Sequence, residues 1–374
     1  MTRPAGRNEV LSPSSLFKRI PHKREFLART FRSLGVLRLL EELPVPRRQG
    51  LLVFTFHRIA RTGIHANPYY DPVISASPET FEGQIQLLAS RYQILHLNEL
   101  SGLSADRFSR SGKPFVLITF DDGYRDNFDV ALPILARHGV PATFFIPTGY
   151  IEAPRLPWWD HVAYVIKHTR AASFQVERKV DDANPIRVSL GEDPSELERT
   201  SAIVTIINQF LAGAIPDESW FLARLGEAAR VAVESERLGR ELFMGWNEIS
   251  QLSAAGMTIG SHGRDHLALG QLGEKKQAEQ LVDSRRLLEA KLHREVSAIA
   301  YPYGWPGTFT ARTLELAREA GYCWGFSSTE GINRLDAPGW EPLALRRLNV
   351  GWSDSALMLR ARASLYAVAG RSVL

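Results

Sequence analysis

Residues 115–124 read Phe-Val-Leu-Ile-Thr-Phe-Asp-Asp-Gly-Tyr, and this stretch decides the fold. Its first six residues, Phe115–Phe120, form a short apolar run that is typical of a buried strand. Two adjacent carboxylates, Asp121 and Asp122, follow directly, and Gly123 permits a sharp exit from the strand. Adjacent buried carboxylates are costly unless they are paired or bound to a metal. The stretch therefore predicts a buried strand with chemistry at its carboxyl end.

Strand and helix patterns alternate on both sides of this stretch. Helical patterns cover 127–138, 273–293 and 309–320, and a further helix is expected after Ser77. Further apolar runs predict strands at 51–56, 142–146, 257–260, 296–301 and 322–326. This alternation indicates an α/β protein with parallel strands. With about seven strands, a closed or nearly closed barrel is favoured over an open sheet.

Residues 152–243 break this rhythm. They hold an aromatic cluster, a charged stretch and helical patterns near 195–212 and 217–235, with Asp193-Pro194 as a helix start. Because the segment leaves directly after the strand at 142–146, we expect a helical insertion near the active-site face. The expected barrel comprises residues 51–151 and 244–374.

Residues 1–50 form a basic segment that precedes the barrel. They hold eleven Lys and Arg against four acids, a net charge of +7, whereas the whole chain carries +4. Apolar residues recur in it at helical spacing, so it predicts an amphipathic helix that caps the domain or lies on an anionic membrane surface. A nucleic-acid partner is disfavoured. The segment lacks the apolar run of a secretory signal, which predicts a cytoplasmic protein with peripheral membrane association as the alternative.

Polar residues stand where the predicted strands end. In a parallel barrel all carboxyl ends open onto one face, so separate motifs can meet there. Two histidines four residues apart on one helical turn present both rings to one point, and with an aspartate they suit a catalytic zinc. A turn after a strand could aim a backbone N–H at an oxyanion. The motifs are Asp121-Asp122, His262 with His266, Tyr301-Pro302-Tyr303-Gly304, and His57.

Each pattern alone has a plain structural explanation. Asp-Asp-Gly is commonly a turn, and an isolated His-x-x-x-His is commonly incidental. Their joint occurrence at successive strand ends is what points to a metal-dependent site.

The motifs Leu117–Tyr124, Ser261–His266 and Tyr301–Gly304 together resemble the polysaccharide deacetylase, or NodB-homology, family. The resemblance covers roughly residues 50–151 and 244–350. It implies a distorted (β/α) barrel and a divalent metal, usually zinc. It also implies the roles of the site residues: Asp121 as general base, Asp122, His262 and His266 as metal ligands, and Tyr303 as the donor of an oxyanion-hole N–H.

The chain departs from the family pattern in two places. Many members carry an arginine that orients the base where this chain has Ala300. Many also carry a C-terminal Leu-x-x-His that supplies the general acid, whereas residues 345–348 here read Leu-Arg-Arg-Leu. Some branches share Phe/Tyr-His-Arg after the first strand, so His57 is the first candidate for the acid and His161 the second. The alternative for His57 is a hydrogen-bonded structural role.

The sequence thus predicts a metal-dependent hydrolase, acting on a carbon–nitrogen bond outside peptides. It would remove acetyl groups, N-linked in the main interpretation, from a sugar in a polysaccharide, oligosaccharide or glycan precursor. A glycosidase using Asp121 and Asp122 is one alternative, but it leaves the two histidines unexplained. A catalytically inactive glycan-binding relative is the other, and it does not require the complete set of base and ligands that this chain carries.

Overall fold

The computed structural model describes residues 50–63, 66–103, 114–334 and 340–369. Almost all of the basic segment 1–50 lies outside these ranges, so its predicted helix and membrane contact stay predictions. No helix within the described ranges is long and apolar enough to cross a membrane.

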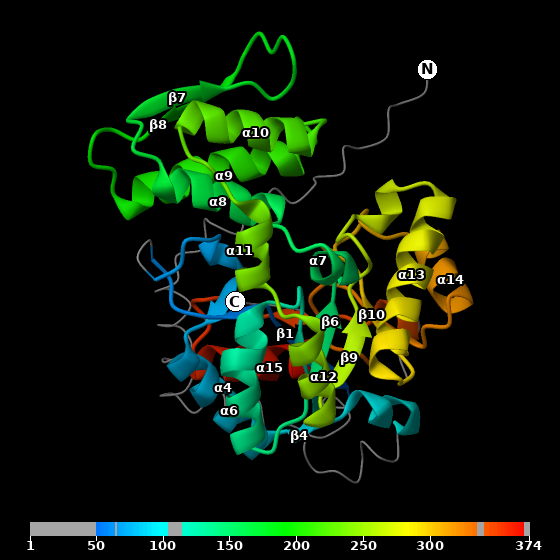
Figure 1. Ribbon diagram of the computed structural model, residues 1–374. Coiled ribbons are helices and arrows are strands. Elements are labelled where there is room, and N and C mark those ends of the chain that lie inside the picture. The colour runs from blue at the N-terminus through cyan, green and yellow to red at the C-terminus, as the bar shows by residue number, and fades with distance from the viewer. Residues whose placement is uncertain (1–49, 64–65, 104–113, 335–339, 370–374) are drawn as a thin grey trace, which may run out of the picture.

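A sheet of parallel strands forms the centre of the molecule (Figure 1). The strand order is β11-β10-β9-β6-β5-β1-β12, and the short strand β4 (Gln93–Ile94) also pairs with β5. A parallel bridge between Phe326 of β11 and Leu345, just before β12, joins the two edges of the sheet. The predicted distorted (β/α) barrel of about seven parallel strands is confirmed. The strands are β1 (Leu51–Phe56), β5 (Phe115–Phe120), β6 (Thr143–Ile146), β9 (Thr258–Ser261), β10 (Ala298–Ala300), β11 (Trp324–Phe326) and β12 (Leu348–Asn349).

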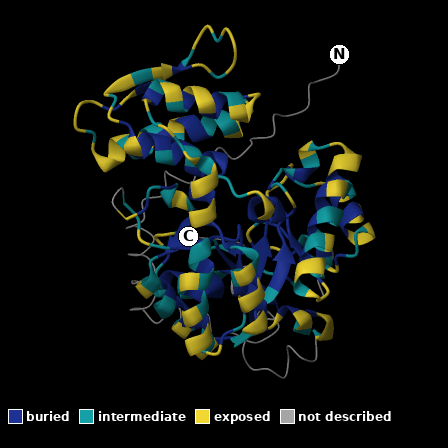
Figure 2. Ribbon diagram, in the orientation of Figure 1, coloured by how far each residue is buried: buried dark blue, intermediate teal, exposed yellow. Residues whose placement is uncertain are grey.

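The barrel strands are apolar because both of their faces are covered. Every residue of β1 and β5 is buried. Phe120 stacks between Phe56 and Phe144, with ring centroids 5.4 and 4.7 Å away. Figure 2 shows these buried strands surrounded by helices whose outer faces are exposed. Because the strands are packed on both faces, the residues that follow their carboxyl ends are held in defined positions.

Helices follow the strands around the barrel. Helix α4 (Pro78–Arg91) begins after Ser77, whose hydroxyl accepts a hydrogen bond from the Thr80 N–H. The other barrel helices are α6 (Leu132–Arg137), α7 (Thr148–Glu152), α12 (Trp246–Ala254), α13 (Glu274–Leu292), α14 (Ala311–Glu319) and α15 (Ala356–Ala369). The shorter elements are β2 (Arg58–Ile59), β3 (Ile74–Ala76), a π-helical turn (Asn127–Ala131) and 3-10 turns at Asp71–Val73, Leu97–Gly102, Leu269–Gln271 and Pro342–Ala344.

Between α7 and α12 the chain forms a second group of elements, most of which lie at the top of Figure 1. It comprises α8 (Trp158–His168), an antiparallel hairpin of β7 (Ser173–Val176) and β8 (Ile186–Ser189), α9 (Glu196–Leu211), α10 (Glu218–Ala229) and α11 (Ser235–Leu242). The sequence patterns did not predict the hairpin. They also placed the start of α9 too early, because Ser195, and not Asp193, caps this helix by accepting the Glu198 N–H.

Candidate active site

The residues predicted for the site follow the carboxyl ends of neighbouring parallel strands. His57 follows β1, the two aspartates follow β5, His262 follows β9, and Tyr303 follows β10. Parallel pairing places these ends on one side of the sheet.

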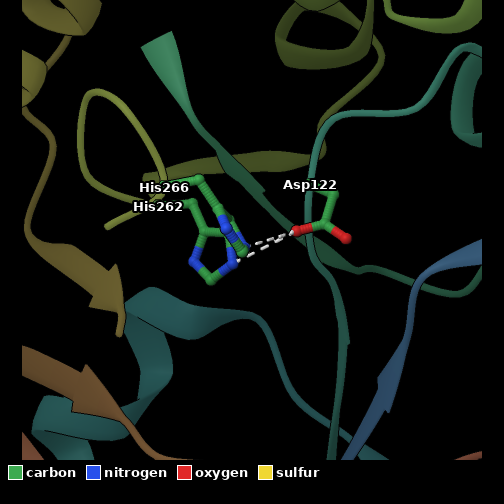
Figure 3. Close-up of side chains that lie close together, drawn as sticks. All are labelled: Asp122, His262 and His266. Atoms are coloured by element: carbon green, nitrogen blue, oxygen red, sulfur yellow. Dashed lines mark ion pairs between the residues drawn. The ribbon is translucent and has the colours of Figure 1, made fainter. Parts of the chain in front are cut away.

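Asp122, His262 and His266 meet in a buried cluster at this end of the barrel (Figure 3). Oδ1 of Asp122 lies 3.3 Å from Nε2 of His262 and 3.3 Å from Nε2 of His266. This oxygen is buried and has no hydrogen-bond partner in the described chain. A buried carboxylate oxygen that faces two ring nitrogens without a hydrogen bond suits a shared cation. The donor set of one carboxylate and two imidazoles fits a catalytic divalent metal such as zinc.

A hydrogen bond from the second ring nitrogen of His262 fixes the orientation of its ring toward Asp122. Its Nδ1 lies 2.7 Å from the carbonyl oxygen of Ala300, so we assign the proton to Nδ1. That assignment leaves the Nε2 lone pair directed at the cluster, as a metal ligand requires. Burial disfavours the charged form of Asp122, but the two histidine rings beside its carboxylate, with the charge of His57, hold the pKa of Asp122 well below its usual value.

The two histidines lie in a loop after β9, and the prediction that they share one helical turn is wrong. The start of α7 holds this loop, because the N–H of Gly149 donates to the Arg264 carbonyl at 2.7 Å. Gln280 of α13 holds it from the other side by accepting the Asp265 N–H at 2.8 Å. These contacts turn the loop back, so that both rings face Asp122.

Three site residues have positive φ angles, a region that L-amino acids rarely adopt. They are Asp122 at 72°, His266 at 52° and Tyr303 at 64°. Such strained conformations gather at functional sites, because the surrounding contacts must enforce them. The sequence did not reveal this strain.

Asp121 points to a different partner from that of Asp122. Its two oxygens each lie 2.8 Å from a terminal nitrogen of Arg347, and Arg347 is fully buried. Burial, the largest single effect, disfavours the charged carboxylate, but Arg347, His262 and His57 together outweigh it, and the pKa of Asp121 is lowered. Sequence reasoning missed this pairing. The available signal was a charged residue, Arg347, next to the apolar start of β12.

Aromatic side chains form a wall beside the cluster. The ring of Trp159 lies 5.0 Å from that of His266, and the ring of Tyr303 lies 5.0 Å away from it as well. Nε1 of Trp158 donates to the Tyr303 hydroxyl at 3.4 Å. Helix α8 therefore lies against the site. The backbone N–H of Tyr303 has no acceptor among the described residues, which leaves it available to a bound oxyanion.

The two histidines considered for the general acid differ in their surroundings. His57 follows Phe56, which pairs with Phe120 just before Asp121, and the charge of His57 contributes to lowering the pKa of both Asp121 and Asp122. In the described chain His57 is hydrogen-bonded through its backbone only, to Ser75 and Asn127. Burial lowers the pKa of His161 to about 4, which makes His161 a poor proton carrier near neutrality.

A buried network connects α8 to the strand end at Asp122. Nε1 of Trp159 donates to the Tyr124 hydroxyl at 3.0 Å, and this hydroxyl donates to Oδ2 of Asp160 at 3.0 Å. The backbone N–H of Tyr70 donates to Oδ1 of Asp160. Burial raises the pKa of Asp160 to about 6 despite these contacts and the charge of Arg58.

Comparison with known proteins gives a consistent result. The family model described as polysaccharide deacetylase matches residues 109–201 and 209–324. The polysaccharide deacetylase homologue YxkH of Bacillus subtilis is 27% identical over 227 residues, which span 60% of this chain and 74% of YxkH.

Two solved structures share the fold. The Streptococcus pyogenes deacetylase PplD has a TM-score of 0.53 and 20% identity, covering 83% of this chain and 96% of PplD. IcaB from Ammonifex degensii has a TM-score of 0.51 and 19% identity, covering 84% of this chain and 97% of IcaB.

Proposed function

The chain belongs to the polysaccharide deacetylase family, a family of carbohydrate deacetylases, and on that premise we propose that it is a metal-dependent hydrolase of N-acetylated glycans. The observation that carries this proposal is the buried meeting of Asp122, His262 and His266 around one carboxylate oxygen that has no hydrogen-bond partner in the described chain. This geometry and the family resemblance together support the roles of the site residues.

Asp122, His262 and His266 would hold the metal, for which zinc is our first choice. When bound, a divalent cation polarises the acetyl carbonyl and lowers the pKa of water. Borderline metals suit this mixture of imidazole and carboxylate better than magnesium does.

Asp121 takes the proton of the attacking water as general base. Its ion pair with Arg347 keeps it ionised and fixes the direction of its oxygens. The free N–H of Tyr303 donates to the oxygen on which negative charge develops. His57 donates a proton to the departing sugar amine, because an amide anion is too basic to leave by itself.

The same geometry argues against a glycosidase. A glycosidase needs two carboxyl groups that flank the bond to be cleaved. Here Asp121 is engaged by Arg347 through both oxygens, and Asp122 is turned toward two histidines. Neither carboxyl group is placed as a free general acid.

Two broader assignments remain proposals. We propose that residues 51–151 and 244–374 form the catalytic barrel and that 152–243 is a helical insertion at its mouth. We also propose that the basic segment 1–50 mediates any peripheral membrane contact, in keeping with its net charge of +7.

The experiment that tests the proposed function is acetate release. Zinc-loaded protein is incubated with a panel of N- and O-acetylated sugars and oligosaccharides, and free acetate is assayed. We expect release from N-acetylated glycans that depends on zinc and is absent in the His262→Ala/His266→Ala variant. Cleavage of glycosidic bonds without acetate release would overturn the proposal.

A further inference from the structure

Two of the tryptophans in this chain are much more exposed to solvent than the others. The chain has eight tryptophans, and all eight are described. Trp305 and Trp352 are 46% and 45% exposed, whereas the other six are buried or half-buried. Single exposed apolar residues are common on protein surfaces, so exposure alone indicates little. The positions of these two in the fold are the informative feature.

Both tryptophans follow carboxyl ends of barrel strands. Trp305 lies in the loop after β10, and Trp352 lies in the loop after β12. β10 pairs with β11, and the Phe326–Leu345 bridge joins β11 to the segment before β12. The two loops therefore lie on either side of the loop after β11, at the end of the barrel that holds Asp122, His262 and His266.

Hydrogen bonds tie these three loops together. The N–H of Ser328, in the loop after β11, donates to the carbonyl of Gly304 at 2.7 Å. The side-chain amide of Asn349 donates to the carbonyl of Ser328 at 3.3 Å. Ser328 thus links Gly304, the residue before Trp305, to Asn349 at the end of β12. We call the three hydrogen-bonded loops after β10, β11 and β12 the rim, and both tryptophans lie on it.

This rim also contacts the reacting groups. The ring of Trp305 lies 5.3 Å from that of Tyr303, which in turn lies 5.0 Å from the ring of His266. Arg347, which holds Asp121, donates through Nε to the carbonyl of Ser327 in the loop after β11. A ligand on the exposed face of Trp305 would therefore lie next to Tyr303, whose ring contacts His266.

The chemistry of the exposed rings indicates what covers them. An indole presents a flat apolar face and one polar N–H. That combination matches a pyranose ring, which has an apolar C–H face and hydroxyl groups at its edge. Resting on the proposed deacetylase function, we propose that Trp305 and Trp352 are stacking platforms for sugar units next to the one that loses its acetyl group.

The test compares chain lengths of one substrate. Acetate release is measured for N-acetylglucosamine and for its longer β-linked oligomers, with wild type, Trp305→Ala, Trp352→Ala and Trp305→Phe. We expect the ratio of kcat/KM for the longest oligomer over that for the monomer to fall about tenfold in each Ala variant, mainly through KM. The Phe variant keeps most of the ratio. Leu197→Ala is the control, because Leu197 is 78% exposed on α9 and should leave the ratio unchanged.

Two outcomes overturn the proposal. An equal loss on monomer and oligomer would mean that Trp305 only supports Tyr303, and an unchanged ratio in both Ala variants would mean that neither ring binds sugar. Binding is also followed by the quenching of tryptophan fluorescence by the oligomers, which needs no turnover. If wild type releases no acetate, the proposed function fails. The quenching still tests the stacking role separately, because a stacking role requires weaker oligomer binding in both Ala variants than in wild type.

Discussion

Arg347 and Asp121 form a buried ion pair in which each carboxylate oxygen lies 2.8 Å from a guanidinium nitrogen. The family resemblance places the arginine that orients the base at the position of Ala300, on β10. In this chain the guanidinium reaches Asp121 from the other side, immediately before β12. The carbonyl of Ala300 faces His262 instead. We infer that Arg347 takes the place of that arginine from a different strand of the same barrel.

Arg347→Met is expected to shift the acid limb of the pH profile upward. Burial raises the pKa of Asp121, but Arg347, together with His262 and His57, more than offsets that effect, so this pKa is lowered. Without Arg347, burial dominates and raises this pKa, so the ionised base forms only at higher pH. We expect kcat/KM to fall by at least about tenfold near neutrality, since general-base catalysis contributes roughly 10²–10⁴-fold. The measurement is the pH dependence of kcat/KM with a zinc-loaded enzyme.

The neighbouring residue offers a matched control. Arg346 is exposed, and its side chain contacts the Glu330 carbonyl at 3.4 Å, so Arg346→Met should leave the profile unchanged. Because loss of one partner from a buried pair costs about 3–5 kcal/mol, thermal unfolding of Arg347→Met is recorded alongside. An acid limb that stays in place in folded Arg347→Met protein would contradict the assignment.

The metal assignment predicts a loss of bound ion in the His262→Ala/His266→Ala variant. Removal of two of three protein ligands leaves a single carboxylate, which cannot retain a divalent ion at micromolar concentration. Elemental analysis after gel filtration gives the metal content per chain. His161→Ala serves as the comparison, since His161 is not part of the cluster. Full occupancy in the double variant would show that the metal binds elsewhere.

Asp121→Asn is expected to keep the metal and lose most activity. Asparagine has nearly the same shape as aspartate but cannot accept a proton from water. We expect turnover to fall by roughly 10²–10⁴-fold with unchanged zinc content. Turnover within about threefold of wild type would place the base at another residue.

The parts of this molecule that were predictable follow from local patterns. The buried strands at Leu51–Phe56 and Phe115–Phe120 were predicted to the residue, because a continuous apolar run has few alternatives in an α/β protein. The contact of Arg347 with Asp121 was not predictable in this way. It joins residues 226 positions apart, and no periodicity records which charged side chain turns inward. The loop of His262 and His266 was misjudged for a similar reason, since its shape depends on Gln280 of α13.

Asp160 predicts a pH dependence of stability. Its pKa is raised from 3.8 to about 6 by burial, so the folded state holds the proton more tightly than the unfolded state does. The contribution of protonated Asp160 to the free energy of unfolding is therefore present at low pH and is lost as the pH rises from about 4 through about 6. Relative to Asp160→Asn, wild type should lose up to ~3 kcal/mol of unfolding free energy across this range.

Urea unfolding of both proteins at several pH values measures this difference. The comparison isolates Asp160, because the other titrating groups are common to both proteins. Asparagine can still accept the Tyr70 N–H, and its amide N–H can donate to the Tyr124 hydroxyl in place of the hydrogen bond that this hydroxyl donates to Asp160. A difference that does not change with pH would show that Asp160 carries no titration-linked penalty.

The last prediction concerns the proton donor. Residues 345–348 hold no histidine, and Arg347 is engaged with Asp121, so this segment offers no acid. His57 follows β1, which pairs with β5, and its charge contributes to lowering the pKa of both Asp121 and Asp122. His161 has a pKa near 4 and is rarely protonated at neutral pH.

His57→Gln should therefore lower turnover by roughly 10²-fold or more at unchanged zinc content, whereas His161→Gln should change it little. The decisive measurement uses two leaving groups. An N-acetylated sugar expels a basic amine and needs a proton donor, whereas an acetyl ester of a nitrophenol expels a stable anion and needs none. Loss of the donor should then impair the amide substrate far more than the ester. An equal loss of turnover on both substrates would mean that His57 only positions other groups. The proton donor to the amine would then be Asp121, after it has taken the proton of water.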